Sequence, residues 1–249
     1  MNGVLDRLYS QGRHQRPEYV FRYKTRSLLV RYAVNNFLNM SSGQHLLDLG
    51  AADGLNLLEF NALLEGDWII SGIEYSSELL AEAPDLPSNI SLDRGDITQP
   101  LAEQEWRRYD IVTALAVLEH LQHPVNAVKN ATEALKNGGI FVATSPVPFW
   151  DKLSSRLGLL KGGQHECDMN SKALIGCLEA AGLTVEECGK FMWAPISFLP
   201  YLKVRVSPAR SMYFDALIRK CRIFNFLFVN QYVIGRKVGD VAVSNLNNI

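Results

Sequence analysis

The feature that most constrains the fold is a regular alternation of short apolar runs with helical stretches between residues 45 and 145. The first run, HLLDLG, ends in an acidic residue and small residues, the pattern of a buried strand that turns sharply into a helix. Further strands are expected at 68–74, 90–96, 109–117 and 139–145. Because strands joined by helices pair in parallel, this alternation predicts a doubly wound α/β fold with helices on both faces of the sheet.

Helices are expected between these strands and on either side of them, at 19–39, 55–64, 76–83, 124–138 and 171–181. Two more segments, 184–191 and 230–238, alternate like strands. They would complete a Rossmann-like, seven-stranded, mostly parallel sheet whose last strand runs antiparallel at the edge.

The chain is expected to divide into an N-terminal helical cap, 1–40, and a main domain, 41–249, with an insertion at 192–229 before the last strand. From Ser211 to Val229 apolar residues recur at helical spacing among basic ones, which predicts an amphipathic helix. Such a helix can touch an anionic membrane surface, cover a ligand pocket or contact a second copy in a homodimer. These alternatives stay open at this point.

Composition removes several classes of protein. Charged residues make up 20% of the chain and hydrophobic residues 47%, as in an ordinary globular protein. There is no apolar run long enough to span a membrane and no apolar core of a signal peptide at the N-terminus. We therefore expect a cytoplasmic location, and peripheral contact with the membrane is the alternative to a location away from it. The four cysteines form no C-x-x-C pair, so we expect neither a disulfide framework nor a metal site.

The loop after the first strand reads DLGAADG and is the expected ligand site. A pyridine dinucleotide would favour G-x-G-x-x-G, but the third position is Leu55 here, and Asp48 and Asp53 would stand beside its pyrophosphate. Like charges in a partly dry cleft repel, which disfavours a phosphate and favours a cation. S-adenosylmethionine carries a sulfonium and an ammonium and no phosphate, so it fits this loop better.

The sequence resembles the class I S-adenosylmethionine-dependent methyltransferases, especially their type-11 small-molecule branch, over about 46–191 and 230–238. The family's first motif, acid-x-Gly-x-Gly-x-Gly, matches Asp48, Gly50 and Gly54, with Ala52 in place of the middle glycine.

Later motifs of the family also have counterparts in this chain. The resemblance implies that Glu74 binds the ribose hydroxyls, that Asp96 accepts from the adenine amino group and that Ile97 packs on the ring. ALAVLEHLQHP, which starts at Ala114, resembles the family's segment after strand four and makes Ala114 a further cofactor contact. LKNGGIFVATSP at 135–146 resembles the entry to strand five.

Methyl transfer needs proximity and alignment, and it needs a general base only when the acceptor is a hydroxyl. His120, after strand four, and His165, after strand five, are the candidate bases. No Asp/Asn-Pro-Pro-aromatic tetrad follows strand four, which argues against nucleic-acid substrates and leaves small-molecule, lipid or glycan acceptors. The sequence therefore predicts an O-methyltransferase, with an NAD-dependent oxidoreductase or a non-catalytic nucleoside-binding module as alternatives.

Overall fold

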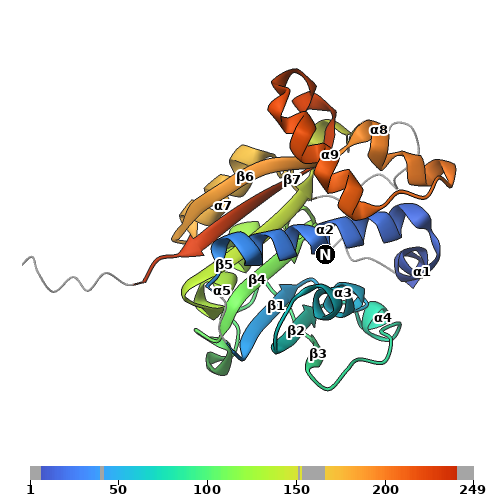
Figure 1. Cartoon of the computed structure of the whole chain (residues 1–249). Helices are drawn as coiled ribbons and strands as arrows, with labels where there is room; N and C mark the ends of the chain where they lie inside the picture. The colour runs from blue at the N-terminus through green and yellow to red at the C-terminus, as the bar shows by residue number, and fades with distance from the viewer. Residues whose placement is uncertain (1–6, 40–41, 151, 153–165, 240–249) are drawn as a thin grey trace, which may run out of the picture.

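A computed structural model of the chain describes residues 7–39, 42–150, 152 and 166–239. Its centre is a seven-stranded sheet with the order β3-β2-β1-β4-β5-β7-β6 (Figure 1). The strands are β1 (Gln44–Leu49), β2 (Trp68–Glu74), β3 (Ile90–Arg94), β4 (Tyr109–Leu115), β5 (Leu135–Pro146), β6 (Leu183–Trp193) and β7 (Phe228–Lys237). The strands from β3 to β5 pair in parallel and β7 pairs antiparallel with both of its neighbours, which confirms the predicted fold class.

Helices follow the strands in the expected order. They are α1 (Arg7–Gln15), α2 (Pro17–Phe37), α3 (Leu55–Leu63), α4 (Ser77–Leu80), α5 (Pro124–Ala134), α7 (Ser171–Ala180), α8 (Ala194–Ser197) and α9 (Pro208–Lys220). Short 3-10 turns lie at η1 (Glu103–Glu105), η2 (Leu118–His120), η3 (Leu199–Leu202) and η4 (Arg222–Leu227). The sequence pattern did not predict α1, because its residues are mostly polar and form no apolar stripe.

The predicted edge position of the last strand is wrong, because β7 lies between β5 and β6. Both of its faces are buried, since Ile234 belongs to the core on one side of the sheet and Val233 to the core on the other. Strand β6 takes the edge and leaves alternate side chains partly or fully exposed along its first half.

Two other boundaries also differ from the prediction. Helix α5 ends at Ala134 rather than near residue 138, because β5 begins at Leu135 and its pairing with β4 shifts register before Ile140. Helix α4 ends at Leu80 rather than at residue 83, which agrees with the bias against helical backbone immediately before Pro84.

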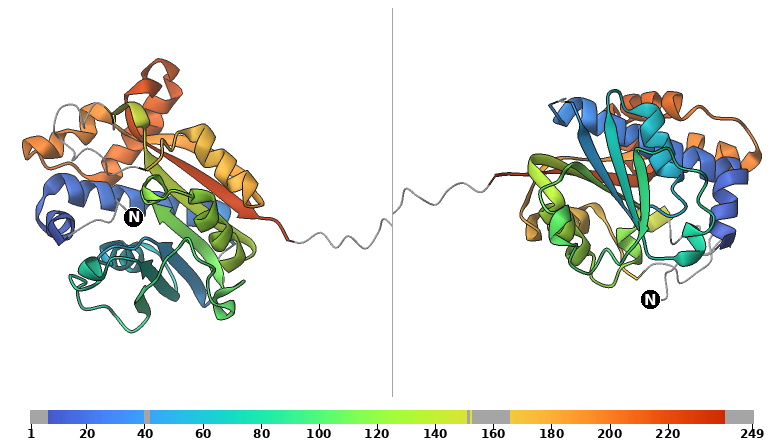
Figure 2. Two further views of the ribbon diagram at one scale, coloured as in Figure 1. Left: turned by 180° about the vertical axis from the view of Figure 1, so that it is seen from behind. Right: turned by 90° about the horizontal axis from the view of Figure 1, so that it is seen from below.

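Helices lie on both faces of the sheet (Figure 2), and two apolar clusters fill the space between the sheet and these helices. On one face, Val30 of α2 and Phe60 of α3 pack against the sheet, and on the other face, Val128 of α5 and Leu174 of α7 do the same. Because α2 contributes to the first cluster, most of the predicted N-terminal cap shares the core of the main domain.

The insertion is not one amphipathic helix. α9 ends at Lys220, Cys221 breaks the helix, and Phe228 is a fully buried residue that begins β7. Ser211 and Asp215 are the buried residues of α9 and Met212 packs against the core, whereas its apolar residues at 214 and 217 are exposed. None of the helices in the described part of the chain is long and apolar enough to cross a membrane.

Candidate active site

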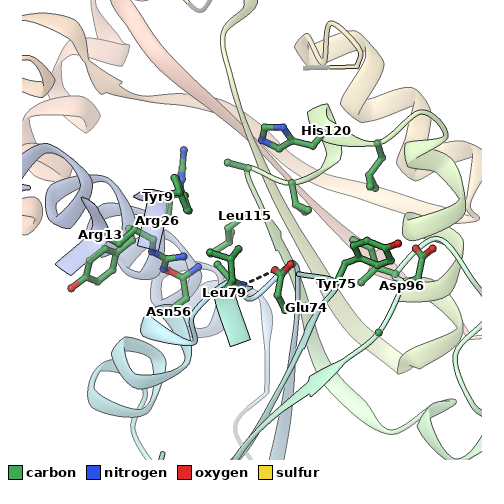
Figure 3. Close-up of a pocket in the computed structure, with 18 residues that line it drawn as sticks. Tyr9, Arg13, Arg26, Asn56, Glu74, Tyr75, Leu79, Asp96, Leu115 and His120 are labelled. Atoms are coloured by element: carbon green, nitrogen blue, oxygen red, sulfur yellow. Dashed lines mark hydrogen bonds between the residues drawn. The ribbon is translucent and has the colours of Figure 1, made fainter. Parts of the chain in front are cut away.

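A pocket with an empty volume of about 890 Å³ lies where the strand order reverses, between β1 and β4 (Figure 3). In doubly wound sheets this is the place where ligands bind, at the carboxyl ends of the strands. The side chains and backbone that line it come from the strand ends and from the two N-terminal helices. They include Gly50, Ala52, Glu74, Tyr75, Asp96, Ile97, Leu115, Ala116, Val117, His120, Tyr9, Arg13, Tyr23, Arg26 and Asn56.

The loop after β1 has three residues with left-handed backbone. Gly50, Ala52 and Gly54 have φ angles of 74°, 53° and 77°. A Cβ at Gly50 would lie 2.5 Å from Cγ2 of Val117, so this position accepts only glycine without a shift of the next loop. Ala52 adopts the same type of backbone with a side chain, which costs on the order of 1 kcal/mol. Gly50 and Ala52 line the pocket and Gly54 caps α3.

Glu74 ends β2 and lines the pocket, as predicted. Its Oε2 accepts a hydrogen bond of 2.9 Å from the Ala52 N–H, and its Oε1 accepts one of 2.8 Å from the Ser76 N–H. These bonds hold the carboxylate at the pocket and leave lone pairs on both oxygens for two hydroxyl donors. The carboxylate also ties the loop after β1 to the end of β2.

Asp96 and Ile97 follow β3 and line the pocket. Oδ1 of Asp96 accepts from the N–H of Thr98 at 2.9 Å and from its hydroxyl at 2.7 Å, so this oxygen also stabilises a turn. Tyr75 adds an aromatic ring that is 46% exposed, and the sequence reasoning missed it. Its position directly after the acidic residue that ends β2 could have indicated that Tyr75 lines the pocket.

Asp48 lies behind the loop rather than in the pocket wall. It is fully buried, and its Oδ1 accepts a hydrogen bond of 2.5 Å from the Thr113 hydroxyl, whereas Oδ2 has no hydrogen-bond partner in 7–39, 42–150, 152 or 166–239. Burial raises the pKa of Asp48 to about 7, although hydrogen bonds from Thr113 and Asn56 act in the opposite direction. A cation held at this loop would stabilise the ionised form.

Ala114 is not brought to the pocket. It lies inside β4, fully buried in the core cluster that faces α5 and α7. The residues after it, Leu115, Ala116 and Val117, line the pocket instead, and Ala116 has a left-handed φ of 58° that turns the chain out of the strand.

The two candidate bases have different outcomes. His120 ends η2 and lines the pocket, where Figure 3 shows it across the cavity from Glu74. Its neighbour Glu119 is buried, and one of its carboxylate oxygens has no hydrogen-bond partner. His165 lies outside the described residues.

The sequence reasoning also missed the contribution of α1 to the site. Arg13 of α1 is buried, and it pairs with Asp53 at 3.3 Å and donates to Oδ1 of Asn56 at 3.0 Å. Ser10 donates to Asp53 at 2.7 Å. These contacts of α1 therefore neutralise Asp53 and hold this helix at the pocket. The charge of Asp53 does not act against an anionic ligand, in contrast to the expectation from the sequence.

Arg26 of α2 is the least compensated cation at the pocket. Its NH2 donates one long hydrogen bond of 3.4 Å to Asn230, and its Nε is buried with no hydrogen-bond partner among the residues that the structure describes. Burial lowers the pKa of the Arg26 guanidinium, because the charged form loses water contacts. Arg13 and Arg26 lie on the side of the pocket opposite Asp96, so the cavity is cationic at one end and acidic at the other (Figure 3).

Comparison with known proteins identifies the class. A family profile described as a methyltransferase domain matches residues 13–188, more than half of the chain. Together with the sheet order and the pocket, this match shows that the chain belongs to the class I S-adenosylmethionine-dependent methyltransferases, and its cofactor is S-adenosyl-L-methionine. The match decides against the NAD-dependent oxidoreductase.

Individual relatives agree with this class. The chain is similar to a ubiquinone biosynthesis O-methyltransferase of Burkholderia vietnamiensis, with 29% identity over 62% of this chain and 71% of the relative. Among solved structures, a putative methyltransferase bound to a methyltransferase activator of Haloferax volcanii has a TM-score of 0.61 and 15% identity, over 93% of this chain and 94% of that one. Phosphoethanolamine N-methyltransferase 2 of Haemonchus contortus has a TM-score of 0.59 and 15% identity, over 95% of this chain and 61% of that one. At such identities the two structures show a shared fold only.

Proposed function

We propose that the chain transfers the methyl group of S-adenosylmethionine to a hydroxyl oxygen of a small molecule, a lipid or a glycan precursor. The observation that carries this proposal is His120, a residue able to take a proton, in the pocket wall next to the end of β4. The O-methyltransferase from Burkholderia vietnamiensis, similar over 62% of the chain, supports an oxygen acceptor.

The residues present fit the cofactor in charge and in hydrogen-bonding capacity. Glu74 would accept from the ribose hydroxyls, and Tyr75, Asp96 and Ile97 would hold the adenine. Arg26, whose buried Nε has no partner within the described part of the chain, would bind the carboxylate of the methionine part. When bound, the cofactor supplies a methyl group on a positively charged sulfur, which is already a good leaving group.

His120 is assigned the role of general base. A histidine in this position takes the proton from the acceptor hydroxyl and so makes the oxygen a better nucleophile. Residues of α1 and α2 form one wall of the pocket, which would limit the contact of water with the reacting groups.

The test replaces His120 with Asn and measures methyl transfer from radiolabelled cofactor to fractions of an extract of the source cells. We expect kcat to fall by about two to four orders of magnitude, the usual contribution of a general base. Binding of S-adenosylhomocysteine, measured by calorimetry, is expected to stay unchanged. The labelled product, analysed by mass spectrometry, identifies the acceptor atom.

His123, an exposed residue at the start of α5 that does not line the pocket, provides the matched control. Replacement of His123 with Asn should leave kcat unchanged. Full turnover of the His120 variant, or a product methylated on nitrogen or carbon, would contradict O-methylation with this base.

A further inference from the structure

An unusual number of large apolar side chains are exposed on α9 and η4. Ile223 is 75% exposed, Tyr213 66% and Phe226 64%, and Phe214, Leu217 and Phe224 are also exposed. Removing large apolar side chains from water is favourable, so six of them in contact with water on adjacent elements form a surface suited to a partner.

Charged residues on the same segment are nearly all basic. Arg210 and Lys220 of α9 are exposed beside the apolar residues, and Lys203 and Arg205 are exposed in the preceding loop. We refer to the six apolar residues together with Arg210 and Lys220 as the apolar-basic surface. The acidic residue of this segment, Asp215, is buried and accepts backbone N–H groups of Met192 and Trp193 at 2.7 and 3.0 Å.

The way α9 packs explains why the apolar residues face outward. Asp215 fastens the polar side of the helix to the end of β6, and Arg219 donates to the Lys190 carbonyl at 3.1 Å and to the Tyr232 hydroxyl at 3.2 Å. These polar contacts use the inner face of α9. The apolar residues of the outer face therefore stay exposed to water in the described part of the chain.

We propose that the apolar-basic surface binds the anionic surface of a lipid bilayer. The surface combines exposed Phe, Tyr, Leu and Ile with Arg and Lys, and the described residues of α9 and η4 include no exposed acidic residue. This combination matches the bilayer interface, where apolar acyl chains lie beneath negatively charged headgroups. A second copy of the chain fits poorly, because a two-fold contact would place this positive surface against itself. This inference does not depend on the identity of the methyl acceptor.

The surface lies on the same side of the molecule as the active site. Pro146, at the carboxyl end of β5, pairs with Asn230 near the start of β7, and the insertion precedes β7 (Figure 1). Nε1 of Trp150, just after β5, donates to the Phe226 carbonyl at 3.0 Å. Because the pocket also opens at the carboxyl ends of the strands, docking would bring the membrane close to it.

The experiment is co-sedimentation of the whole protein with vesicles of phosphatidylcholine alone and with vesicles that also contain phosphatidylglycerol. We expect binding to the second kind, weakened by salt. The double variant Arg210→Gln/Lys220→Gln should bind on the order of 30-fold more weakly, because each basic residue near the surface contributes roughly fivefold. The double variant Phe214→Ser/Phe226→Ser should lose on the order of tenfold or more.

Matched controls use exposed residues elsewhere on the molecule. Lys129→Gln/Lys172→Gln and Trp106→Ser change the same kinds of side chain on α5, α7 and the residue after η1, and they should bind vesicles like the unchanged protein. All variants should bind S-adenosylhomocysteine normally, which separates loss of docking from loss of the cofactor site.

Three results would overturn the proposal. One is absence of sedimentation with the anionic vesicles. Another is self-association in light scattering that Phe214→Ser/Phe226→Ser abolishes, which would identify a second copy as the partner. The third is equally tight binding to poly-glutamate that does not depend on Phe214 and Phe226, which would identify an acidic polypeptide instead.

Discussion

The two ends of the cofactor pocket differ in how they are built. At the acidic end, Glu74 is the last residue of β2 and Asp96 lies two residues after the end of β3, so local sequence sets their positions. At the cationic end, Arg13 and Arg26 come from α1 and α2, which reach the pocket only by packing across the sheet. A sequence pattern can therefore locate the residues at strand ends, whereas the position of a residue on a covering helix depends on tertiary packing.

The largest effect is expected at the acidic end. Replacement of Glu74 with Ala removes the acceptor for the ribose hydroxyls and leaves the N–H groups of Ala52 and Ser76 without their partner. Each of the two charged hydrogen bonds contributes about 1.5–3 kcal/mol, so affinity for S-adenosylhomocysteine should fall by about two to four orders of magnitude in calorimetry. Glu74→Gln, which keeps one acceptor oxygen, should lose less. Normal affinity of Glu74→Ala would remove the ribose assignment.

The next effect is expected at the cationic end, where two ligands can be compared, one with the methionine carboxylate and one without it. Arg26→Met should weaken binding of S-adenosylhomocysteine by about tenfold or more and leave binding of methylthioadenosine unchanged, because the second ligand lacks the carboxylate. Competition titrations with both ligands measure this difference. Equal losses for both ligands would mean that Arg26 acts on the fold of the pocket rather than on the carboxylate.

A third prediction concerns Asp48 and pH. Its pKa is raised to about 7 by burial, so the folded protein holds a proton that the unfolded chain has released, and the free energy of unfolding falls as pH rises from about 4 to about 7. A bound cation favours the ionised carboxylate, so cofactor affinity should increase from pH 6 to pH 8, with proton release. Asp48→Asn should raise the melting temperature at pH 8 and remove the pH dependence of binding. A variant that keeps the pH dependence would show that another group titrates.

The smallest effect is expected in the loop between the two ends. Ala52→Gly removes a side chain from a left-handed backbone position and should stabilise the protein by about 0.5–1 kcal/mol, visible as a rise of the melting temperature. Gly50→Ala is the opposite change at a neighbouring position, and it should destabilise the protein, because the new methyl group would meet Val117. If Ala52→Gly lowers the melting temperature, the backbone at residue 52 is not strained.

Most of the fold could be predicted because each strand carries its own apolar run and its own turn. The position of β7 between β5 and β6 could not, since the pattern of 230–238 is the same for an edge strand and for an inner one, and pairing partners decide between them. The insertion shows the same limit. Its apolar residues at helical spacing predicted one amphipathic helix from Ser211 to Val229, but α9 ends at Lys220. Polar contacts of Asp215 and Arg219 on its inner side leave the apolar residues at 214 and 217 exposed.

The site follows the same division. Gly50, Ala52, Glu74, Asp96, Ile97 and His120 line the pocket, at positions that the loop pattern and the family resemblance indicated. Asp48 and Ala114 lie behind it, one buried below the loop and one inside β4, because a pattern of residues does not tell which side of a turn faces the cavity. The ion pair of Asp53 with Arg13 had no local signal at all.

The most direct test of the account is a crystal structure with S-adenosylhomocysteine bound. We expect the adenine to lie between Tyr75 and Ile97, the ribose hydroxyls to donate to Glu74 and the carboxylate to pair with Arg26, with the sulfur toward His120. A ligand bound in the reverse direction, with its carboxylate near Asp96, or bound outside this pocket, would contradict it.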